Sequence, residues 1–332
     1  MKRVAIIGAG SWGTALGIMA ARAGHDVCMW SRNEAIVKSI NRDHLNAVYL
    51  TTERIPNGVR ATIDFAEALA GAELTILAAP SHAVRDLLTQ MLPALNTENI
   101  VVSATKGIEI ESGKRISQIV AQVAGSSTRF VCLSGPSFAK EVVAKHPTAI
   151  VAASNDIEAA HLVQAELSFE NLRIYTNDDV VGTEIGGSVK NVMAIAAGMT
   201  SGLGFGSNTI AALITRGLAE VTRLAVHEGA KVETLMGLAG LGDLVLTCTG
   251  SLSRNRFVGE ELGRGKTLKE ITSGMTEIAE GIKTTMAVKR IADRLRIEMP
   301  ITNEVCAVLY NGKPAREAVA ELMRRRLREE GS

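Results

Sequence analysis

The chain has 332 residues, of which 46% are hydrophobic, and its 36 basic and 35 acidic side chains leave a formal net charge of +1. This length suits two domains with ample hydrophobic cores. The balanced charge excludes a global field that would recruit nucleic acid or an anionic membrane, and an aromatic content of 3% argues against a surface that stacks on bases. No apolar run reaches the ~18 residues of a membrane span.

The cysteines indicate a cellular compartment. They are widely spaced, form no CxxC motif, and are Cys28, Cys132, Cys248 and Cys306. Buried free thiols are the expectation for such cysteines, and this fits a reducing cytoplasm. The chain enters its first strand almost at once and leaves no room for a signal peptide. No His, Cys or Asp cluster has metal-ligand spacing, so we expect a cytoplasmic protein without a metal.

A glycine-rich turn lies between a strand and a helix near the start of the chain. The apolar run at residues 4–7 leads into GAGSWG at residues 8–13, and a helix-like segment follows. Gly8 permits the tight turn, Gly10 lets the backbone approach a pyrophosphate, and Gly13 lets helix and strand pack closely. The N–H groups at the helix start would face the phosphates. This context predicts a dinucleotide site, and a glycine turn without a ligand is the lesser alternative.

The second strand pattern, at residues 26–30, bears on which nicotinamide cofactor is used. NAD sites usually place Asp or Glu at the end of this strand to accept a hydrogen bond from the ribose 2′-hydroxyl. This sequence has Ser31 and Arg32 instead. A guanidinium can pair with a 2′-phosphate in a bidentate manner. We therefore expect NADPH to be preferred and NADH to be usable, although Arg32 could also stack on the adenine or be solvated.

Strand-like and helix-like runs alternate through the first half of the chain. Further strands are predicted at residues 60–63, 74–79, 99–105, 129–133, 148–153 and 172–175. This alternation is typical of a mainly parallel, doubly wound sheet. From about Asp178 onward, long segments rich in Ala, Gly, Leu and Met have helical spacing. We predict an α/β fold with a Rossmann-like doubly wound domain at residues 1–178 and an all-helical substrate-binding and catalytic domain at 179–332.

Polar residues follow two of these strands, and ligands of open α/β sheets lie beyond the carboxyl ends of strands. Lys106 comes directly after residues 99–105. Residues 135–139, GPSFA, follow the strand at 129–133 and could open a helix that offers N–H groups to an anion. Taken alone, Lys106 is as readily a solvated loop lysine as a ligand.

Lys190 and Asn191 interrupt a segment at residues 184–199 that is otherwise mostly Gly, Ala, Val, Met and Ile. A helix that is apolar on all sides is buried, and burial of an ammonium group lowers its pKa toward neutrality. A lysine in that state suits proton transfer to or from an alcohol or carbonyl oxygen. The alternative is a lysine whose ammonium group reaches the surface. We favour the catalytic interpretation.

A third cluster lies within residues 237–259. Asp243 is the one charge in the apolar, glycine-rich half of this segment and could pair with a buried lysine. Ser253, Arg254 and Asn255 follow at a predicted helix start, with Ser253 as the N-cap. A guanidinium, an amide and a helix N-terminus together suit a phosphate group, although an ordinary basic helix start has the same pattern.

These segments jointly resemble a known family. GAGSWGTAL, SATKGIE, SGPSFAKEV, GGSVKNV, GLGDL, SRN and AEGIKTT occur in the order and spacing of the soluble, bacterial-type NAD(P)-dependent glycerol-3-phosphate dehydrogenases, and the similarity covers essentially the whole chain. The resemblance implies a Rossmann domain followed by a helical one. It also implies reversible reduction of dihydroxyacetone phosphate to sn-glycerol 3-phosphate, a precursor of glycerophospholipids.

The resemblance assigns roles to individual residues. Lys190 would donate or accept the proton on the C2 oxygen, Asp243 would bind substrate and fix this lysine, and Lys106 would contact cofactor and substrate. The remaining expected cofactor contacts are Ser11, Trp12, Arg32, Ala139, Arg254, Ile278 and Glu280. The remaining expected substrate contacts are Gly135, Ser137, Ser253, Arg254 and Asn255. The partner is thus a small phosphorylated molecule, and we expect a homodimer formed through the helical domain.

Two other functions fit parts of the pattern. Another dehydrogenase of the β-hydroxyacid type would share the Rossmann domain, the helical domain and a catalytic lysine, but would not need the SRN cluster. A non-catalytic NADPH sensor would have no reason to bury Lys190 or to pair it with Asp243.

Overall fold

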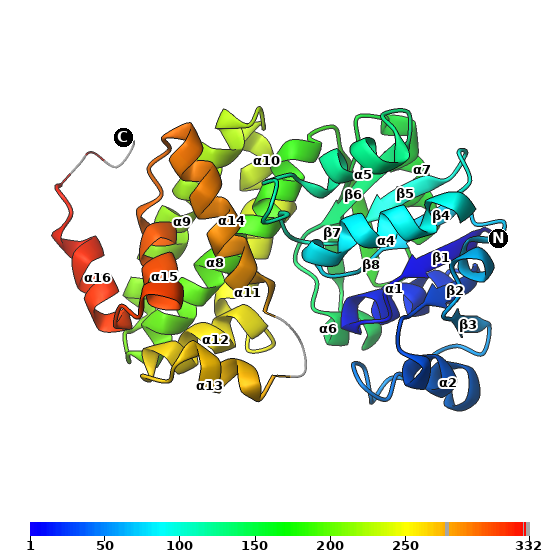
Figure 1. Cartoon of the computed structure of the whole chain (residues 1–332), viewed down its shortest axis with the longest axis horizontal. Helices are drawn as coiled ribbons and strands as arrows, with labels where there is room; N and C mark the ends of the chain where they lie inside the picture. The colour runs from blue at the N-terminus through cyan, green and yellow to red at the C-terminus, as the bar shows by residue number, and fades with distance from the viewer. Residues whose placement is uncertain (276–278, 328, 330–332) are drawn as a thin grey trace.

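The computed structural model describes residues 1–275, 279–327 and 329, and Figure 1 shows two lobes side by side. One lobe is an eight-stranded sheet in the order β3-β2-β1-β4-β5-β6-β7-β8, in which only the β6–β7 pair is antiparallel. The strands are β1 (Arg3–Ile7), β2 (Asp26–Trp30), β3 (Val59–Thr62), β4 (Leu74–Leu77), β5 (Ile100–Ser103), β6 (Arg129–Ser134), β7 (Thr148–Ala153) and β8 (Leu172–Asn177).

All eight strands predicted from the sequence form. The strand expected at residues 60–63 is β3, which stops one residue early at Thr62, and two others stop two residues early. The expected strand at residues 74–79 is β4, which stops at Leu77, and the expected strand at 99–105 is β5, which stops at Ser103. Pro80 has no N–H to donate, so the chain after β4 turns away from the sheet into the short 3₁₀ helix η1 (Ser81–Ala83). The residues lost from both strands form loops at the carboxyl edge of the sheet.

Helices cover both faces of the sheet, as a doubly wound fold requires. They are α1 (Ser11–Arg22), α2 (Glu34–Asp43), α3 (Phe65–Leu69), α4 (Val84–Met91), η2 (Leu92–Ala94), α5 (Ile116–Ala124), α6 (Ala139–Val143) and α7 (Ile157–Leu167). Alternate residues of β1 point to opposite faces. Val4 and Ile6 pack in the core with α1, α2, α6 and α7, whereas Ala5 and Ile7 pack with α3, α4 and α5. The Rossmann-like architecture is confirmed.

From α8 onward the chain is helical, and we call this part the helical lobe and the sheet with its helices the sheet lobe. The helices are α8 (Val180–Gly202), α9 (Ser207–His227), α10 (Val232–Met236), the π-helical turn η3 (Leu238–Gly242), α11 (Asp243–Thr249), α12 (Arg254–Gly263), α13 (Leu268–Ser273), α14 (Glu280–Leu295), α15 (Pro300–Asn311) and α16 (Ala315–Arg324). None of the helices described is both long and apolar enough to cross a membrane.

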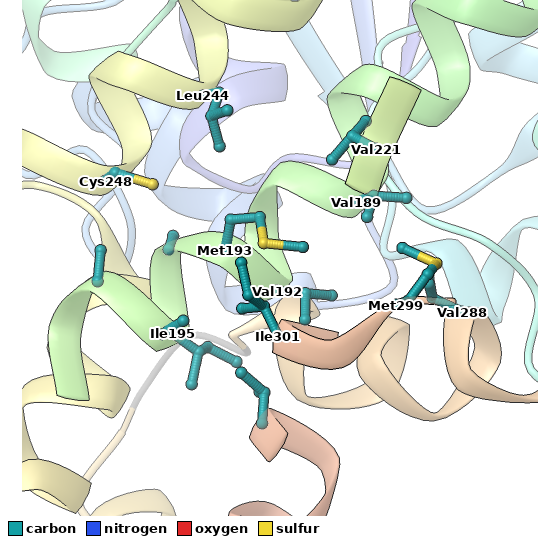
Figure 2. Close-up of a cluster of buried hydrophobic side chains, with 14 of the residues drawn as sticks. Val189, Val192, Met193, Ile195, Val221, Leu244, Cys248, Val288, Met299 and Ile301 are labelled. Carbon is teal, nitrogen blue, oxygen red and sulfur yellow. The ribbon is translucent and has the colours of Figure 1, made fainter. Parts of the chain in front are cut away.

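Helix α8 is the centre of the helical lobe, as its apolar composition predicted. It is buried at Val180 and throughout residues 182–200. Figure 2 shows Val192 and Met193 of α8 surrounded by side chains from the neighbouring helices, among them Val221 of α9 and Val288 of α14. Lys190 and Asn191 are therefore held in a rigid, desolvated helix rather than on a surface.

Glycines allow α8 and α12 to cross with their backbones nearly in contact. A Cβ atom on Gly198 would lie 2.0 Å from the Arg256 carbonyl oxygen, and one on Gly259 would lie 1.9 Å from the Ile195 carbonyl oxygen. No side chain larger than hydrogen fits at either position. This close approach brings the start of α12 next to the polar residues of α8.

Candidate active site

The glycine turn between β1 and α1 has the geometry that a bound dinucleotide needs. Gly8 has φ +115°, and a Cβ on Gly13 would lie 1.9 Å from the Gly8 carbonyl oxygen, so both positions require glycine. Gly10 is the N-cap of α1, makes no side-chain cap, and would have open space around a Cβ atom. The first turn of α1 carries no acidic residue. Its free N–H groups thus suit a diphosphate.

The two side chains of this turn lie beside the same N-terminus. Ser11 Oγ donates a hydrogen bond to the Tyr49 carbonyl oxygen at 3.1 Å. Trp12 is half-buried against the sheet core, and its buried Nε1 has no hydrogen-bond acceptor among the described residues. Such an orphaned donor fits a site whose polar partner is a ligand. Arg32 follows β2 with an exposed side chain, next to buried Ser31.

Lys106, Lys190 and Asp243 meet where the helical lobe covers the carboxyl edge of the sheet. The Lys190 ammonium donates to Asp243 Oδ1, and the Lys106 ammonium donates to Asp243 Oδ2 at 2.7 Å. Asp243 is 0% exposed and Lys190 is 6% exposed. One carboxylate therefore joins a lysine of the sheet lobe to a lysine of α8, as the sequence hypothesis for Lys190 and Asp243 required.

Burial sets the acidity of Lys190. Desolvation lowers its pKa from 10.5 to about 7, and the nearby charge of Lys106 acts in the same direction. The carboxylate of Asp243 opposes this shift by favouring the ammonium form. The result is an amine that can hold or release a proton near neutral pH, which is the property expected of a general acid and base.

Sequence reasoning missed Thr247, which completes this cluster. Lys190 Nζ donates to Thr247 Oγ1 at 2.7 Å, and the hydroxyl donates in turn to the Asp243 carbonyl oxygen at 2.7 Å. Thr247 stands four residues after Asp243 on α11, so the helical spacing could have placed both on one face. The π-helical turn η3 precedes Asp243 directly, and such turns often occur at functional sites.

The loop after β6 approaches the same cluster. The Gly135 carbonyl oxygen accepts from Lys106 Nζ at 2.9 Å and from Ser137 Oγ at 3.0 Å. Gly135 has φ +136°, and a Cβ there would lie 2.9 Å from the Ile150 Cα, so the turn depends on glycine. Ser137 and Ala139 are both half-buried, and α6 begins at Ala139.

The predicted phosphate cluster divides into exposed and buried parts. Ser253 caps α12, as predicted, by accepting a hydrogen bond from Arg256 N at 3.2 Å. Arg254 is the first residue of α12 and has an exposed side chain. Asn255 is buried and already holds the lobe together, because it donates to Asn191 Oδ1 at 3.0 Å and accepts from Gly281 N at 2.9 Å. Among the described residues, the second N–H of its amide has no acceptor and could bind a ligand.

Glu280 lies at the start of α14 and contacts the sheet lobe. Ser81 Oγ donates to Glu280 Oε2 at 2.7 Å, across 199 positions of sequence. A Cβ on Gly107 would come within 3.2 Å of the same carboxylate oxygen. Ile278, the other residue expected beside the nicotinamide, lies outside the described residues. Ser81 and Asn191 were not predicted as partners of this network, although the position of Ser81 after β4 was a signal for the carboxyl edge.

A doubly wound sheet whose first turn suits a diphosphate, joined to helices that supply a lysine of near-neutral pKa, is the architecture of a nicotinamide-dependent dehydrogenase. The models for the N-terminus and the C-terminus of NAD-dependent glycerol-3-phosphate dehydrogenase match residues 3–160 and 179–320. The chain belongs to this family and is an oxidoreductase.

Individual relatives match over nearly the full length of the chain. The chain is 50% identical to a glycerol-3-phosphate dehydrogenase [NAD(P)+] of Koribacter versatilis, and the match covers 98% of both chains. It is 47% identical to the protein of the same description from Geobacter sp. strain M21, with 99% of both chains covered. The crystal structure of glycerol-3-phosphate dehydrogenase from Coxiella burnetii has a TM-score of 0.94 and 40% identity, and the match covers 98% of this chain and 99% of that one.

Proposed function

We propose that this protein reduces dihydroxyacetone phosphate to sn-glycerol 3-phosphate reversibly, with NADPH preferred over NADH, and that the product supplies glycerophospholipid synthesis. The observation that carries the proposal is the buried Lys190, whose pKa of about 7 and bond to Asp243 suit proton transfer to a carbonyl oxygen. The relatives named above support the reaction by their descriptions.

The cofactor, when bound, supplies the hydride that reaches the C2 carbon of the ketone. Negative charge then develops on the C2 oxygen, and the Lys190 ammonium stabilises it and delivers the proton. In the reverse direction the neutral Lys190 amine accepts the proton from the C2 hydroxyl. Asp243 and Thr247 hold the amine in place in both directions, because each has a polar oxygen bonded to Lys190 Nζ.

Lys106 would contribute a second positive charge near the same oxygen. Its ammonium is held between Asp243 Oδ2 and the Gly135 carbonyl oxygen, so its position is fixed before any substrate arrives. Preorganised charge of this kind costs no rearrangement during the reaction. Gly135 and Ser137 would contact the substrate from the adjacent loop.

The phosphate end of the substrate would lie at the start of α12. Ser253 fixes the cap, Arg254 provides an exposed guanidinium, and Asn255 has one amide N–H without an acceptor in the described part of the chain. The N-terminus of a helix adds a favourable dipole for an anion. Ser11, Trp12, Arg32, Ala139 and Glu280 would hold the cofactor across the carboxyl edge of the sheet.

The test measures NADPH fluorescence after addition of dihydroxyacetone phosphate, with unphosphorylated dihydroxyacetone as the matched control. We expect rapid oxidation with the phosphate ester only. Tight NADPH binding without oxidation by either compound would overturn the proposed substrate. Equal rates with both compounds would remove the phosphate site from the proposal.

A further inference from the structure

A hydrogen bond joins the start of α14 in the helical lobe to the carboxyl edge of the sheet. Ser81 is buried, follows β4, and donates its hydroxyl hydrogen to Glu280 at the first position of α14. The Glu280 carboxylate lies beside Gly107, toward the loop after β5. This contact sets the first turn of α14 against η1.

Lys283 lies three residues after Glu280 and therefore on the same face of α14. Its side chain is half-buried. Burial lowers the pKa of His82, the neighbour of Ser81, and the positive charges of Lys283 and Arg32 act in the same direction. Glu280 and Glu111 act on His82 in the opposite direction but are weaker than the leading causes combined.

The strand order explains why these groups converge. Arg32 follows β2 and His82 follows β4, and both strands neighbour β1, which carries the glycine turn. Adjacent strands are about 4.8 Å apart, so the ends of β2 and β4 are about 10 Å apart. Lys283 approaches the same place from the helical lobe. Three groups that are cationic or can become so thus lie near the carboxyl ends of β2 and β4, on either side of the glycine turn that follows β1.

No ion pair to Arg32 or Lys283 is found among the residues that the structure describes, and Glu280, three residues before Lys283 on α14, is hydrogen-bonded to Ser81. Two cations that both act on His82 favour an anion between them. The dinucleotide that fits the glycine turn offers one such anion at this edge, the 2′-phosphate of NADPH.

We propose that Lys283 binds the 2′-phosphate of NADPH together with Arg32, and that this residue of the helical lobe sets the choice between NADPH and NADH. The inference rests on the proposed use of a nicotinamide cofactor. NADH shares the diphosphate but has a hydroxyl in place of the 2′-phosphate, so it offers these two cations no charge at that position. Discrimination therefore comes from attraction to the 2′-phosphate, which only NADPH carries.

The test compares the dissociation constants of NADPH and NADH by calorimetry for the wild type and for Lys283→Gln. A charged hydrogen bond of ordinary strength predicts that the variant loses about tenfold in affinity for NADPH. Affinity for NADH should stay within about twofold, and Lys283→Arg should keep the wild-type preference. The control is Lys289→Gln on the same helix, where the lysine pairs with Asp293. It should change neither constant.

An unchanged ratio of the two constants in Lys283→Gln would overturn the inference, as would an equal loss for both cofactors. This outcome is independent of the substrate. If the wild type fails to reduce dihydroxyacetone phosphate and Lys283→Gln still loses NADPH selectively, the proposed function falls and the role of Lys283 stands. If reduction proceeds and the ratio is unchanged, the role of Lys283 alone falls.

Discussion

The glycine turn of the sheet lobe and the lysine cluster around Asp243 reach function by different means. The turn consists of six consecutive residues and offers backbone N–H groups. Its geometry depends on the absence of a side chain at Gly8 and at Gly13. The cluster joins side chains separated by 53 and 137 positions of sequence, and its chemistry depends on burial. Addition of one methyl group should therefore disturb the glycine turn, and removal of one charge should disturb the lysine cluster.

Removal of the Lys190 side chain should have the largest effect on activity of all the variants considered. Lys190→Ala should lower kcat by about 10²–10⁴-fold, because general acid–base catalysis contributes that much, and should leave the NADPH dissociation constant unchanged. Single-turnover kinetics and calorimetry measure the two quantities. Lys269→Ala, at an exposed position of α13, serves as the control. A variant that keeps the wild-type rate would end the proton-transfer role.

Arg254 tests whether the helical lobe also binds the phosphate end of the substrate. Arg254→Ala should raise KM for dihydroxyacetone phosphate by about 10–100-fold, because it removes a charged hydrogen-bond donor, with a smaller change in kcat. Steady-state kinetics give both values. Arg256→Ala on the same helix, where the guanidinium pairs with Glu260, should leave KM near that of the wild type. A normal KM in Arg254→Ala would exclude this residue from the phosphate site.

Two alanine substitutions in the glycine turn distinguish loss of cofactor affinity from loss of stability. Gly10→Ala should fold normally, because open space surrounds the new methyl group, and should weaken NADPH binding by about tenfold, because that space is where the diphosphate would lie. Gly13→Ala should instead lose about 1–3 kcal/mol of stability, because its Cβ would meet the Gly8 carbonyl oxygen. Denaturant unfolding and calorimetry distinguish the two. Equal destabilisation of both variants would contradict this division.

Thr247 should give the smallest effect. Thr247→Val keeps the shape and removes the oxygen that accepts from Lys190 Nζ, so the pKa of Lys190 should fall further. Loss of one hydrogen bond predicts about a threefold to tenfold lower rate of ketone reduction at neutral pH. The rate should recover at lower pH, where the amine regains its proton. A uniform loss at every pH would assign Thr247 a structural role only.

Most of the fold could be predicted from the sequence, because hydrophobic periodicity and the glycine spacing are local properties. The eight strands, the glycine turn, the buried α8 and the cap at Ser253 all followed from short segments. Lys190 stood out because a charge in an apolar helix is costly. Asp243 stood out for the same reason.

The rest depended on how distant segments pack. Thr247, Asn191 and Ser81 are ordinary polar residues, and their hydrogen-bond partners become identifiable only when α11, α12 and α14 are placed around α8. The hydrogen bonds of Asn255 to Asn191 and Gly281 likewise depend on the close crossing of α8 and α12. That crossing is defined by the backbone contacts at Gly198 and Gly259.

The central claim is that Lys190 carries the transferred proton, and the pH dependence of kcat/KM in both directions tests it most directly. With a pKa of about 7, the ammonium form predominates below neutral pH and the amine form above it. Ketone reduction should therefore fall as pH rises through about 7, and alcohol oxidation should rise over the same range. In Lys190→Arg, whose guanidinium stays protonated, both of these changes in kcat/KM near pH 7 should disappear. A pH dependence of kcat/KM near pH 7 that persists unchanged in Lys190→Arg would contradict the account.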